Sequence, residues 1–345
     1  MTWRELSAKQ LNDLKDPLII DVRSPGEHEA ERILDSTNVP LLSDSERAEV
    51  GTVYVRQGEL LAKMLALRYI SPKIPDIVDS ISAMRQHGQA IVVHCWRGGL
   101  RSEAVASFLS VVGFDCFRLT GGYKAWRKET IRFLEVTDWP FGVLVLQGLT
   151  GTGKTEILKE LDKLGMQVLD LEGLANHRGS AFGGVGLGKQ PTQKNFEAAI
   201  YDKLRIINGG IVFMEAEGRK IGSLNLPKRL LTLITAQPKV LITGSMEVRK
   251  TRLVQDYAQQ TEEARQHALD SLNKLKERLG GQTVTELNEL AQMSKLDEVA
   301  ERLLVAYYDP LYSKHIALTA PYVMTVSGDD PAQAASQICQ FVSSD

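Results

Sequence analysis

The chain has 345 residues, a formal net charge of −2, and 43% hydrophobic and 24% charged residues. This length exceeds what a single hydrophobic core usually organises, so we expect two domains of ordinary globular composition. No apolar run approaches the roughly 18 residues that span a bilayer, and the N-terminus lacks a secretory signal pattern. We therefore expect a cytoplasmic protein with no membrane partner. The net charge argues against a uniformly basic nucleic-acid binder but allows one basic face.

The first 135 residues alternate short apolar strands with amphipathic helical stretches, which predicts a parallel sheet covered on both faces. The expected strands are residues 18–22, 91–95 and 116–119, and the expected helices are 74–85 and 102–112. Residues 136–142 are punctuated by Pro140 and Gly142, so we place the domain boundary there. The predicted domains are residues 1–135 and 136–345.

The strand and helix pattern restarts at Val143, so the second domain should also contain a parallel sheet. The segment 246–308 has helical periodicity almost throughout, with a break at Gly280 and Gly281. A last helix is expected over 332–342. The strands expected in this domain are 143–147, 168–171, 211–215, 240–243 and 322–326.

A Gly-x4-Gly-Lys-Thr pattern follows the strand at 143–147 and precedes a helix, as in Walker A phosphate loops. Glycines let backbone N–H groups converge on phosphate oxygens at a helix N-terminus, and the lysine reaches the terminal phosphates. The predicted phosphate-binding residues are Gly148, Gly151, Gly153, Lys154 and Thr155.

No cofactor is firmly assigned, but Thr155 is in the position that ligates Mg²⁺ in such loops. A carboxylate that supports the metal or the phosphate should end a neighbouring strand, and Asp170 and Glu215 both qualify. Arg249 and Arg252 follow the strand at 240–243. Contact with phosphate and a solvated surface are both open for these arginines, with the solvated surface favoured.

Cys95 begins a second loop of the anion-binding type, because an apolar strand leads into it and a helix follows. The pattern His94-Cys95-x5-Arg101-Ser102 satisfies the signature of Cys-dependent phosphatases, and rhodanese sulfurtransferases use the same arrangement to carry a persulfide. Both use N–H groups at a helix N-terminus to lower a thiol pKa and bind an oxyanion. We predict that Cys95 is the catalytic nucleophile. The predicted anion-binding loop consists of Trp96, Arg97, Gly98, Gly99, Leu100 and Arg101.

Several alternatives around this loop stay open. Arg101 either holds the anion or braces the loop, and His94 is favoured as a strand residue over an acid catalyst. The three cysteines lack the number for a disulfide framework and the spacing for a zinc site, so Cys116 and Cys339 are expected to be packing thiols.

Segments on both sides of the cysteine loop resemble rhodanese. Residues 20–28 are similar to its opening strand and turn, and residues 119–126 are similar to its closing motif. Residues 31–36 depart from the usual pattern, which indicates a divergent member. The expected fold class is α/β: a rhodanese-like parallel-sheet domain, then a P-loop NTPase-like parallel-sheet domain with the helical segment 246–308.

The combination of both domains resembles the tRNA 2-selenouridine synthase family over nearly the whole chain. The local sequences that carry this resemblance are residues 95–102, 148–155, 169–183 and 215–222. The resemblance implies conversion of wobble 2-thiouridine in tRNA to 2-selenouridine with selenophosphate, through an S-geranyl intermediate formed from geranyl diphosphate. In that reaction Cys95 can take selenium from selenophosphate, and the phosphate loop suits a diphosphate as well as ATP. The implied partners are tRNA and a selenophosphate source; the oligomeric state is left open.

The alternative function is a P-loop kinase or ATPase fused to a Cys-dependent phosphatase or sulfurtransferase domain. A third possibility is an idle rhodanese module that acts as a binding scaffold. For tRNA contact, Lys124, Arg127, Lys128 and Arg132 recur at helical spacing, although a solvated helix face is favoured for them. The glycine-rich run 179–188 is either a mobile substrate loop or a plain connection.

Overall fold

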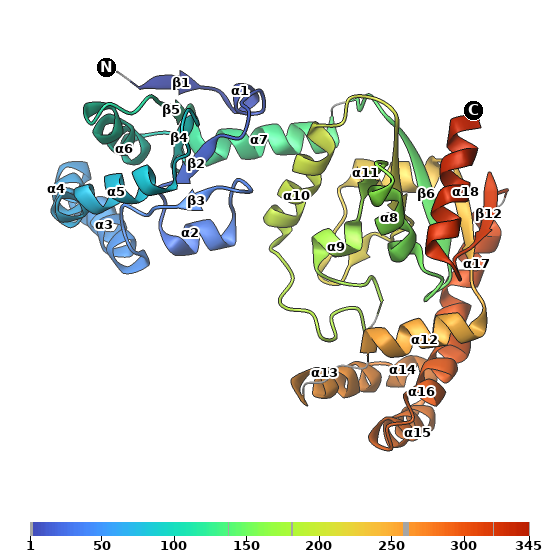
Figure 1. Ribbon diagram of the computed structural model, residues 1–345. Helices are drawn as coiled ribbons and strands as arrows, with labels where there is room; N and C mark the ends of the chain where they lie inside the picture. The colour runs from blue at the N-terminus through green and yellow to red at the C-terminus, as the bar shows by residue number, and fades with distance from the viewer. Residues whose placement is uncertain (1–2, 137, 181, 258–261, 320, 345) are drawn as a thin grey trace. The chain divides into compact units, whose positions relative to one another are not determined.

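The computed structural model describes residues 3–136, 138–180, 182–257, 262–319 and 321–344 (Figure 1). The chain forms two compact units. Unit 1 contains Met1–Thr137 and Thr192–Asp202, and unit 2 contains Asp138–Pro191 and Lys203–Asp345. Residues 192–202 thus join unit 1, although the boundary predicted from sequence lies before them. Within the described residues, no helix has the length and apolar character to cross a membrane.

Unit 1 is built on a five-stranded sheet in which every neighbouring pair of strands is parallel. Ile20 lies beside Val93 in the register, and both side chains are completely buried in the core with Leu109 and Ile81. In sheet order the strands are β1 (Arg4–Leu6), β5 (Cys116–Leu119), β4 (Ile91–His94), β2 (Leu18–Asp21) and β3 (Thr37–Asn38). The helices are α1 (Ala8–Leu11), α2 (Pro25–Ala30), α3 (Asp44–Gln57), α4 (Glu59–Ile70), the 3-10 turn η1 (Ser71–Lys73), α5 (Ile74–Met84), α6 (Leu100–Val111) and α7 (Gly122–Glu135).

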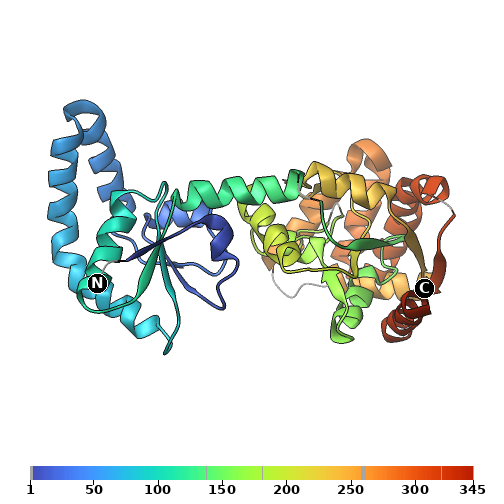
Figure 2. The ribbon, with the colours of Figure 1, turned by 90° about the horizontal axis from the view of Figure 1, so that it is seen from above.

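Helices α3 and α4 form a hairpin that the sequence analysis did not predict, and they run side by side in Figure 2. Ser43 caps α3, and Glu46 completes a capping box with it. Gly58 separates the two helices at a φ of 95°, a left-handed conformation that interrupts the helix.

Helix α10 (Gln193–Arg205) attaches to unit 1 through polar side chains of the segment 192–202. Asn195 accepts a hydrogen bond from the backbone N–H of Arg32 at 3.0 Å. Lys194 forms a 2.7 Å ion pair with Glu31, and Arg127 forms another with Glu197. These contacts explain why a segment far along the sequence belongs to this unit.

Unit 2 contains a second five-stranded parallel sheet, which confirms the predicted fold class. Helices α8 and α18 lie side by side (Figure 1) and bury Ile157, Leu161 and Ile338 in the core with Phe213. In sheet order the strands are β12 (Met324–Ser327), β11 (Lys239–Thr243), β6 (Gly142–Gly148), β8 (Ile211–Glu215) and β7 (Gln167–Leu169). The other elements around this sheet are α8 (Lys154–Lys163), α9 (Leu171–Ala175), the hairpin β9 (Lys220–Ile221) and β10 (Leu224–Asn225), α11 (Lys228–Ala236) and α18 (Pro331–Ser344).

The predicted helical segment 246–308 is confirmed over its described residues, while 258–261 lie outside them, and the predicted break falls at Gly280, whose φ is 82°. This segment has its own apolar core, which also takes in Phe182 and Val185 from the glycine-rich run. The run is therefore anchored by buried side chains. The helices are α12 (Met246–Tyr257), α13 (Glu262–Asn273), α14 (Lys276–Leu279), α15 (Gly281–Gln292), α16 (Leu296–Leu303), the π-helical turn η2 (Leu304–Tyr308) and α17 (Asp309–Thr319).

Candidate functional site

Cys95 lies directly after β4, at the start of the loop that leads into α6. Its side chain is only 4% exposed, and its Sγ is 3.3 Å from Ser102 Oγ and 3.8 Å from the carbonyl oxygen of Gly99. Gly122 has a φ of 59°, and a Cβ there would lie 2.3 Å from the Cys95 carbonyl oxygen. This close approach lets the N–H of Tyr123 donate to the same oxygen at 2.8 Å. The loop is therefore fixed from behind by the segment that follows β5.

The predicted anion-binding residues 96–101 form the connection between β4 and the N-terminus of α6. Gly99 caps this 12-residue helix without a side-chain hydrogen bond, so its first N–H groups are available to an anion. Arg97 is exposed, whereas Arg101 donates to Glu27 at 2.8 Å. Arg101 thus braces the loop against α2, and Arg97 is the cation of this loop that faces solvent.

His94, the residue before Cys95, is completely buried. Burial lowers the pKa of His94 to about 4, although the nearby Asp21 carboxylate opposes this shift. The imidazole is therefore uncharged at neutral pH. This agrees with the favoured interpretation of His94 as a strand residue.

The other two cysteines are not placed for chemistry. Cys116 is fully buried on β5, its Sγ donates to the Ala106 carbonyl oxygen at 3.4 Å, and burial raises the pKa of its thiol to about 11. Cys339 packs against the core of unit 2, and burial raises the pKa of its thiol too.

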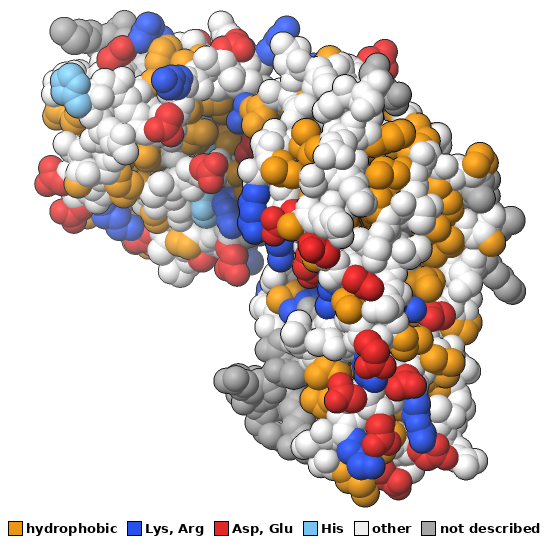
Figure 3. Space-filling view, turned by 45° about the vertical axis from the view of Figure 1, so that its right-hand side comes forward, with side chains coloured by type: hydrophobic (Ala, Val, Ile, Leu, Met, Phe, Trp, Pro, Cys, Tyr) orange, Lys and Arg blue, Asp and Glu red, His pale blue; other side chains and the backbone are white. Residues whose placement is uncertain are grey.

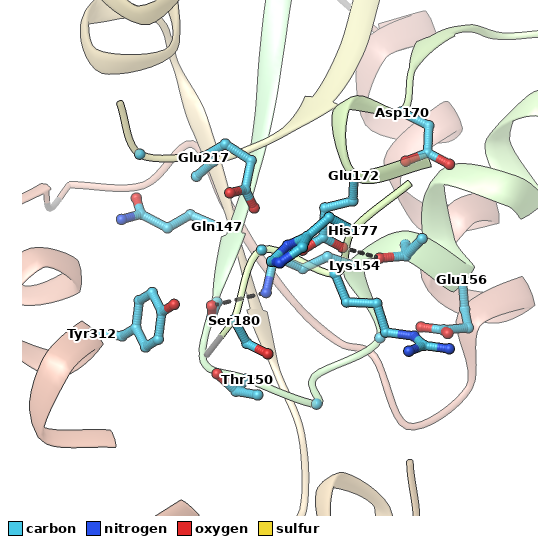
Figure 4. Close-up of a pocket in the computed structure, with 18 of the residues that line it drawn as sticks. Gln147, Thr150, Lys154, Glu156, Asp170, Glu172, His177, Ser180, Glu217 and Tyr312 are labelled. Carbon is cyan, nitrogen blue, oxygen red and sulfur yellow. Dashed lines mark hydrogen bonds between the residues drawn. The ribbon is translucent and has the colours of Figure 1, made fainter. Parts of the chain in front are cut away.

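The phosphate loop opens on a cavity of about 840 Å³ within unit 2 (Figure 4). Lys154 donates from Nζ to the carbonyl oxygens of Gly148 and Leu149 at 3.1 and 3.2 Å. The N-terminus of α8 begins at this lysine, so helix and lysine together present positive charge to the cavity. All five predicted phosphate-binding residues line this cavity. They are Gly148, Gly151, Gly153, Lys154 and Thr155.

Two arginines of α12 hold the phosphate loop from outside. Arg249 is 4% exposed, donates to the Thr150 carbonyl oxygen at 2.8 Å and pairs with Asp309. Arg252 donates to the Gly151 carbonyl oxygen at 3.2 Å and lines the cavity. Gly153 beside this guanidinium has a φ of 91°, a left-handed conformation that favours glycine. The favoured expectation of a solvated surface is wrong for Arg249, because the loop backbone needs its hydrogen bond.

The two predicted supporting carboxylates have different environments. Asp170 follows β7 and caps α9, where it accepts from the N–H of Gly173 at 2.7 Å while still facing the cavity. Glu215 is fully buried at the end of β8 and accepts from the N–H of Glu172 at 2.9 Å. Burial raises the pKa of Glu215 well above its usual range, which favours the neutral form of this side chain.

Two carboxylates that the sequence analysis did not select face the phosphate loop. Glu172 accepts from the Thr155 hydroxyl at 3.1 Å, and Glu217 lines the same cavity. Glu172 lies two residues after Asp170, and Glu217 lies two residues after Glu215. Each is therefore adjacent to a strand end that the sequence indicates. In the part of the chain described, no group of three or more His, Cys, Asp or Glu side chains is arranged to hold a metal by itself.

Apolar side chains also line this cavity, among polar ones such as Thr235 and Lys239. Figure 4 places Tyr312 of α17 across the cavity from Glu172. The apolar side chains in the wall are Leu187, Ile234, Leu253, Leu311 and Ile316. One cavity therefore contains both the phosphate loop and a set of apolar side chains.

Comparison with known proteins decides the family. A family model for the tRNA 2-selenouridine synthase AAA domain matches residues 141–337, and a model for the rhodanese-like domain matches residues 5–129. The chain belongs to the tRNA 2-selenouridine synthase family.

Individual members of this family align over most of their length. The tRNA 2-selenouridine synthase of Cupriavidus necator is 36% identical, with 86% of this chain and 87% of that protein covered. The protein of the same name from Pseudomonas syringae pv. syringae is 34% identical, with 87% and 88% covered. The one from Shewanella sp. strain MR-7 is 31% identical, with 94% and 95% covered. The recognised resemblance is thereby confirmed.

The charge of Glu217 gives this family member a pH dependence that can be measured. Burial, and then the negative charge of Glu172, raise the pKa of Glu217 to about 8. The carboxyl is neutral below that pH and becomes an anion above it, so it should repel a bound diphosphate only in alkaline solution. We expect inorganic pyrophosphate, titrated in EDTA, to bind more weakly as the pH rises through this pKa. Glu217→Gln should remove that decline, and a decline that persists in the variant would contradict the assignment.

Proposed function

We propose that this chain is a tRNA-modifying transferase that converts wobble 2-thiouridine to 2-selenouridine in two steps. Unit 2 transfers a geranyl group from geranyl diphosphate to the thiouridine sulfur. Unit 1 then uses selenophosphate and Cys95 to exchange the geranylated sulfur for selenium. The observation that carries this proposal is the pairing, in one chain, of a loop-held thiol with a phosphate cradle that has an apolar wall.

The wall of the phosphate cavity supports an allylic diphosphate as its occupant. Geranyl transfer forms a bond between the thiouridine sulfur and C1 of the geranyl chain, N3 of the base loses its proton, and the C1–O bond breaks with its electron pair on the diphosphate. Lys154 and the N–H groups of the loop offset the charge that develops on this leaving group. The apolar side chains around Ile234 and Leu311 would cover the hydrocarbon.

Mg²⁺ fits the cradle as a partner of the diphosphate. The Thr155 hydroxyl and the Glu172 carboxylate lie 3.1 Å apart beside the loop, and both are oxygen ligands of the kind that Mg²⁺ accepts. Magnesium ions commonly use one or two carboxylates and complete their shell with phosphate and water. These two residues would hold it, and the ion would offset the charge of the diphosphate.

The direct test supplies the substrates one at a time. Purified protein, 2-thiouridine tRNA and geranyl diphosphate should yield S-geranyl-2-thiouridine, detected by mass spectrometry of the digested nucleosides. Later addition of selenophosphate should convert this nucleoside to 2-selenouridine. Failure to form the geranylated nucleoside would overturn the assignment of unit 2.

Two exposed lysines of α7 are the proposed tRNA contact in unit 1. Lys124 and Lys128 are exposed one turn apart, whereas Arg127 pairs with Glu197 and Arg132 with Glu129. Over the helical segment after Met246, Figure 3 shows acidic and basic side chains interspersed on the visible face, with no single basic field. The α7 lysines therefore remain the better candidates.

Replacement of Lys124 and Lys128 by Glu should weaken tRNA binding and flatten its dependence on salt. Each lost phosphate contact should reduce the magnitude of the slope of log K against log salt by about one, because one fewer counterion is released on binding. Filter binding at several salt concentrations measures this slope. Arg132→Glu is the control, since its guanidinium already contacts Glu129. An unchanged slope in the double variant would return these lysines to the solvated-face interpretation.

A further inference from the structure

The Cys95 step is constrained by electron balance. In selenophosphate, selenium is at the selenide level and phosphorus at the phosphate level. If the thiolate attacked selenium, phosphorus would leave with the bonding electron pair, at the phosphite level. The selenium on cysteine would then need two electrons from a second thiol before it could be released as selenide.

The chain provides no thiol in position for that reduction. Its sequence contains three cysteines. Cys116 is enclosed in the unit 1 core with its Sγ directed at the Ala106 carbonyl oxygen, and Cys339 packs against the core of unit 2. A route through selenium bound to Cys95 would therefore need a reductant from outside the chain.

We propose that Cys95 attacks phosphorus and releases selenide beside the substrate, a step that rests on the proposed function. A sulfur–phosphorus bond forms, the phosphorus–selenium bond breaks, and hydrogenselenide leaves with the electron pair. Selenide then bonds to C2 of the geranylated thiouridine, its proton moves to N3, and the C2–sulfur bond breaks to release geranyl thiolate. Water finally attacks phosphorus, which frees phosphate and the Cys95 thiolate. Every electron pair is accounted for without an added reductant.

The geometry of the loop suits a phosphoryl group. The uncapped N-terminus of α6 and exposed Arg97 can surround three phosphoryl oxygens while Cys95 stands beneath them. The Ser102 hydroxyl donates to the Gly99 carbonyl oxygen at 3.0 Å and lies 3.3 Å from Sγ, so it can turn to donate to the thiolate as it forms and again as it is released. Hydrogenselenide is a weak base, so it can leave without a proton donor. The buried, neutral His94 therefore need not act as an acid in this step.

Isotope labelling separates the two routes. Full-length protein is mixed with selenophosphate labelled with ³²P or, in parallel, with ⁷⁵Se, and is denatured at neutral pH within one turnover. We expect ³²P on wild type and on Cys116→Ala, none on Cys95→Ser, and no ⁷⁵Se on any of them. Protein-bound ⁷⁵Se without ³²P would overturn the proposal while leaving Cys95 as the nucleophile. If neither label reaches the protein or the tRNA, the proposed function itself fails.

A second observation concerns an apolar groove of about 1070 Å³ in unit 1, formed by α3, α4 and α6. Its α6 wall begins in the Cys95 loop itself, with Leu100 and Arg101, and continues through Ala104 and Phe108. The α4 wall presents residues at helical spacing, namely Glu59, Ala62, Lys63, Ala66, Leu67 and Ile70. The groove is thus a continuation of the anion-binding loop and is lined mainly by hydrocarbon.

We infer that this groove holds the geranyl chain of S-geranyl-2-thiouridine during selenium transfer. The inference rests on the proposed function, because the sulfur that carries the chain is bonded to the carbon that accepts selenium. The geranyl chain must therefore lie within reach of the Cys95 loop when the exchange occurs. The groove starts at that loop, is large enough for the chain, and would remove apolar surface of the leaving group from water.

Bulky substitutions in the groove test this site with two leaving groups. Anticodon stem-loops carrying S-geranyl- or S-methyl-2-thiouridine are supplied to wild type, Ala104→Trp and Ala48→Trp, which change opposite walls. Both variants should raise KM for the geranyl substrate at least about tenfold and leave the methyl substrate unaffected. Val111→Trp, on the exposed end of α6, should behave as wild type.

An equal effect on both substrates, or no effect on either, would overturn the assignment of the groove. Sedimentation velocity identifies the competing occupant, since loss of self-association in both tryptophan variants would assign the groove to a second copy of the chain. If wild type does not react with the geranyl substrate at all, the proposed function fails instead. Selenophosphate cleavage at the wild-type rate establishes that each variant is folded.

Discussion

Cys95→Ser should abolish selenium incorporation, with a loss of at least about a thousandfold, while geranylation of 2-thiouridine continues. A serine hydroxyl is scarcely ionised at neutral pH and is a poor nucleophile without an adjacent base. Loss of a catalytic nucleophile commonly costs this much or more. The measurement is nucleoside mass spectrometry with both geranyl diphosphate and selenophosphate present. The variant should accumulate S-geranyl-2-thiouridine and form no 2-selenouridine.

Cys339→Ser is the matched control, since it makes the same change at a half-buried thiol of the unit 2 core. It should retain both activities. If Cys95→Ser formed selenouridine at the control rate, unit 1 would have to supply selenium without its only loop thiol, and the assignment of Cys95 would be lost.

Lys154→Ala should slow geranyl transfer and leave the selenium step intact. The substitution deletes a charged contact to the leaving diphosphate, which is typically stabilising by about 1.5 to 3 kcal/mol, or roughly 10- to 150-fold in rate. Geranylation is followed with a range of geranyl diphosphate concentrations, so that binding and turnover are separated. Lys163→Ala is the control on the same helix, because that side chain is 68% exposed and pairs only with Glu160 among the described residues.

A result in which Lys154→Ala geranylates normally would leave the phosphate cavity without the proposed role. A result in which selenophosphate cleavage fell with geranylation would contradict the division of labour between the units. The control variant should match wild type in both reactions.

The parts of the fold that the sequence predicted share one property, which is strong local periodicity beside a glycine-rich turn. The strands at β4 and β6 are apolar and short, and each delivers its loop to a helix N-terminus, so Cys95 and Lys154 could be placed by inspection. The hairpin of α3 and α4 was missed because its helices expose apolar side chains such as Val55 and Leu60, which blurs the amphipathic pattern.

Long-range polar pairing accounts for most of what the sequence did not predict. Membership of residues 192–202 in unit 1 depends on partners that are distant in sequence. The hydrogen bond from Arg32 to Asn195, for example, joins residues 163 positions apart. Arg249 looks like any exposed helical arginine until the fold brings Thr150 and Asp309 to it. The choice among Asp170, Glu172 and Glu215 likewise depends on burial, which local spacing does not encode.

The most direct test of two separate chemical sites in one chain is a crossed reaction. Wild-type protein first geranylates 2-thiouridine tRNA without selenophosphate, and the purified tRNA is then given to Lys154→Ala or to Cys95→Ser with selenophosphate. We expect Lys154→Ala to form 2-selenouridine at the wild-type rate and Cys95→Ser to form none. Failure of Lys154→Ala on this prepared substrate, or conversion by Cys95→Ser, would contradict the account.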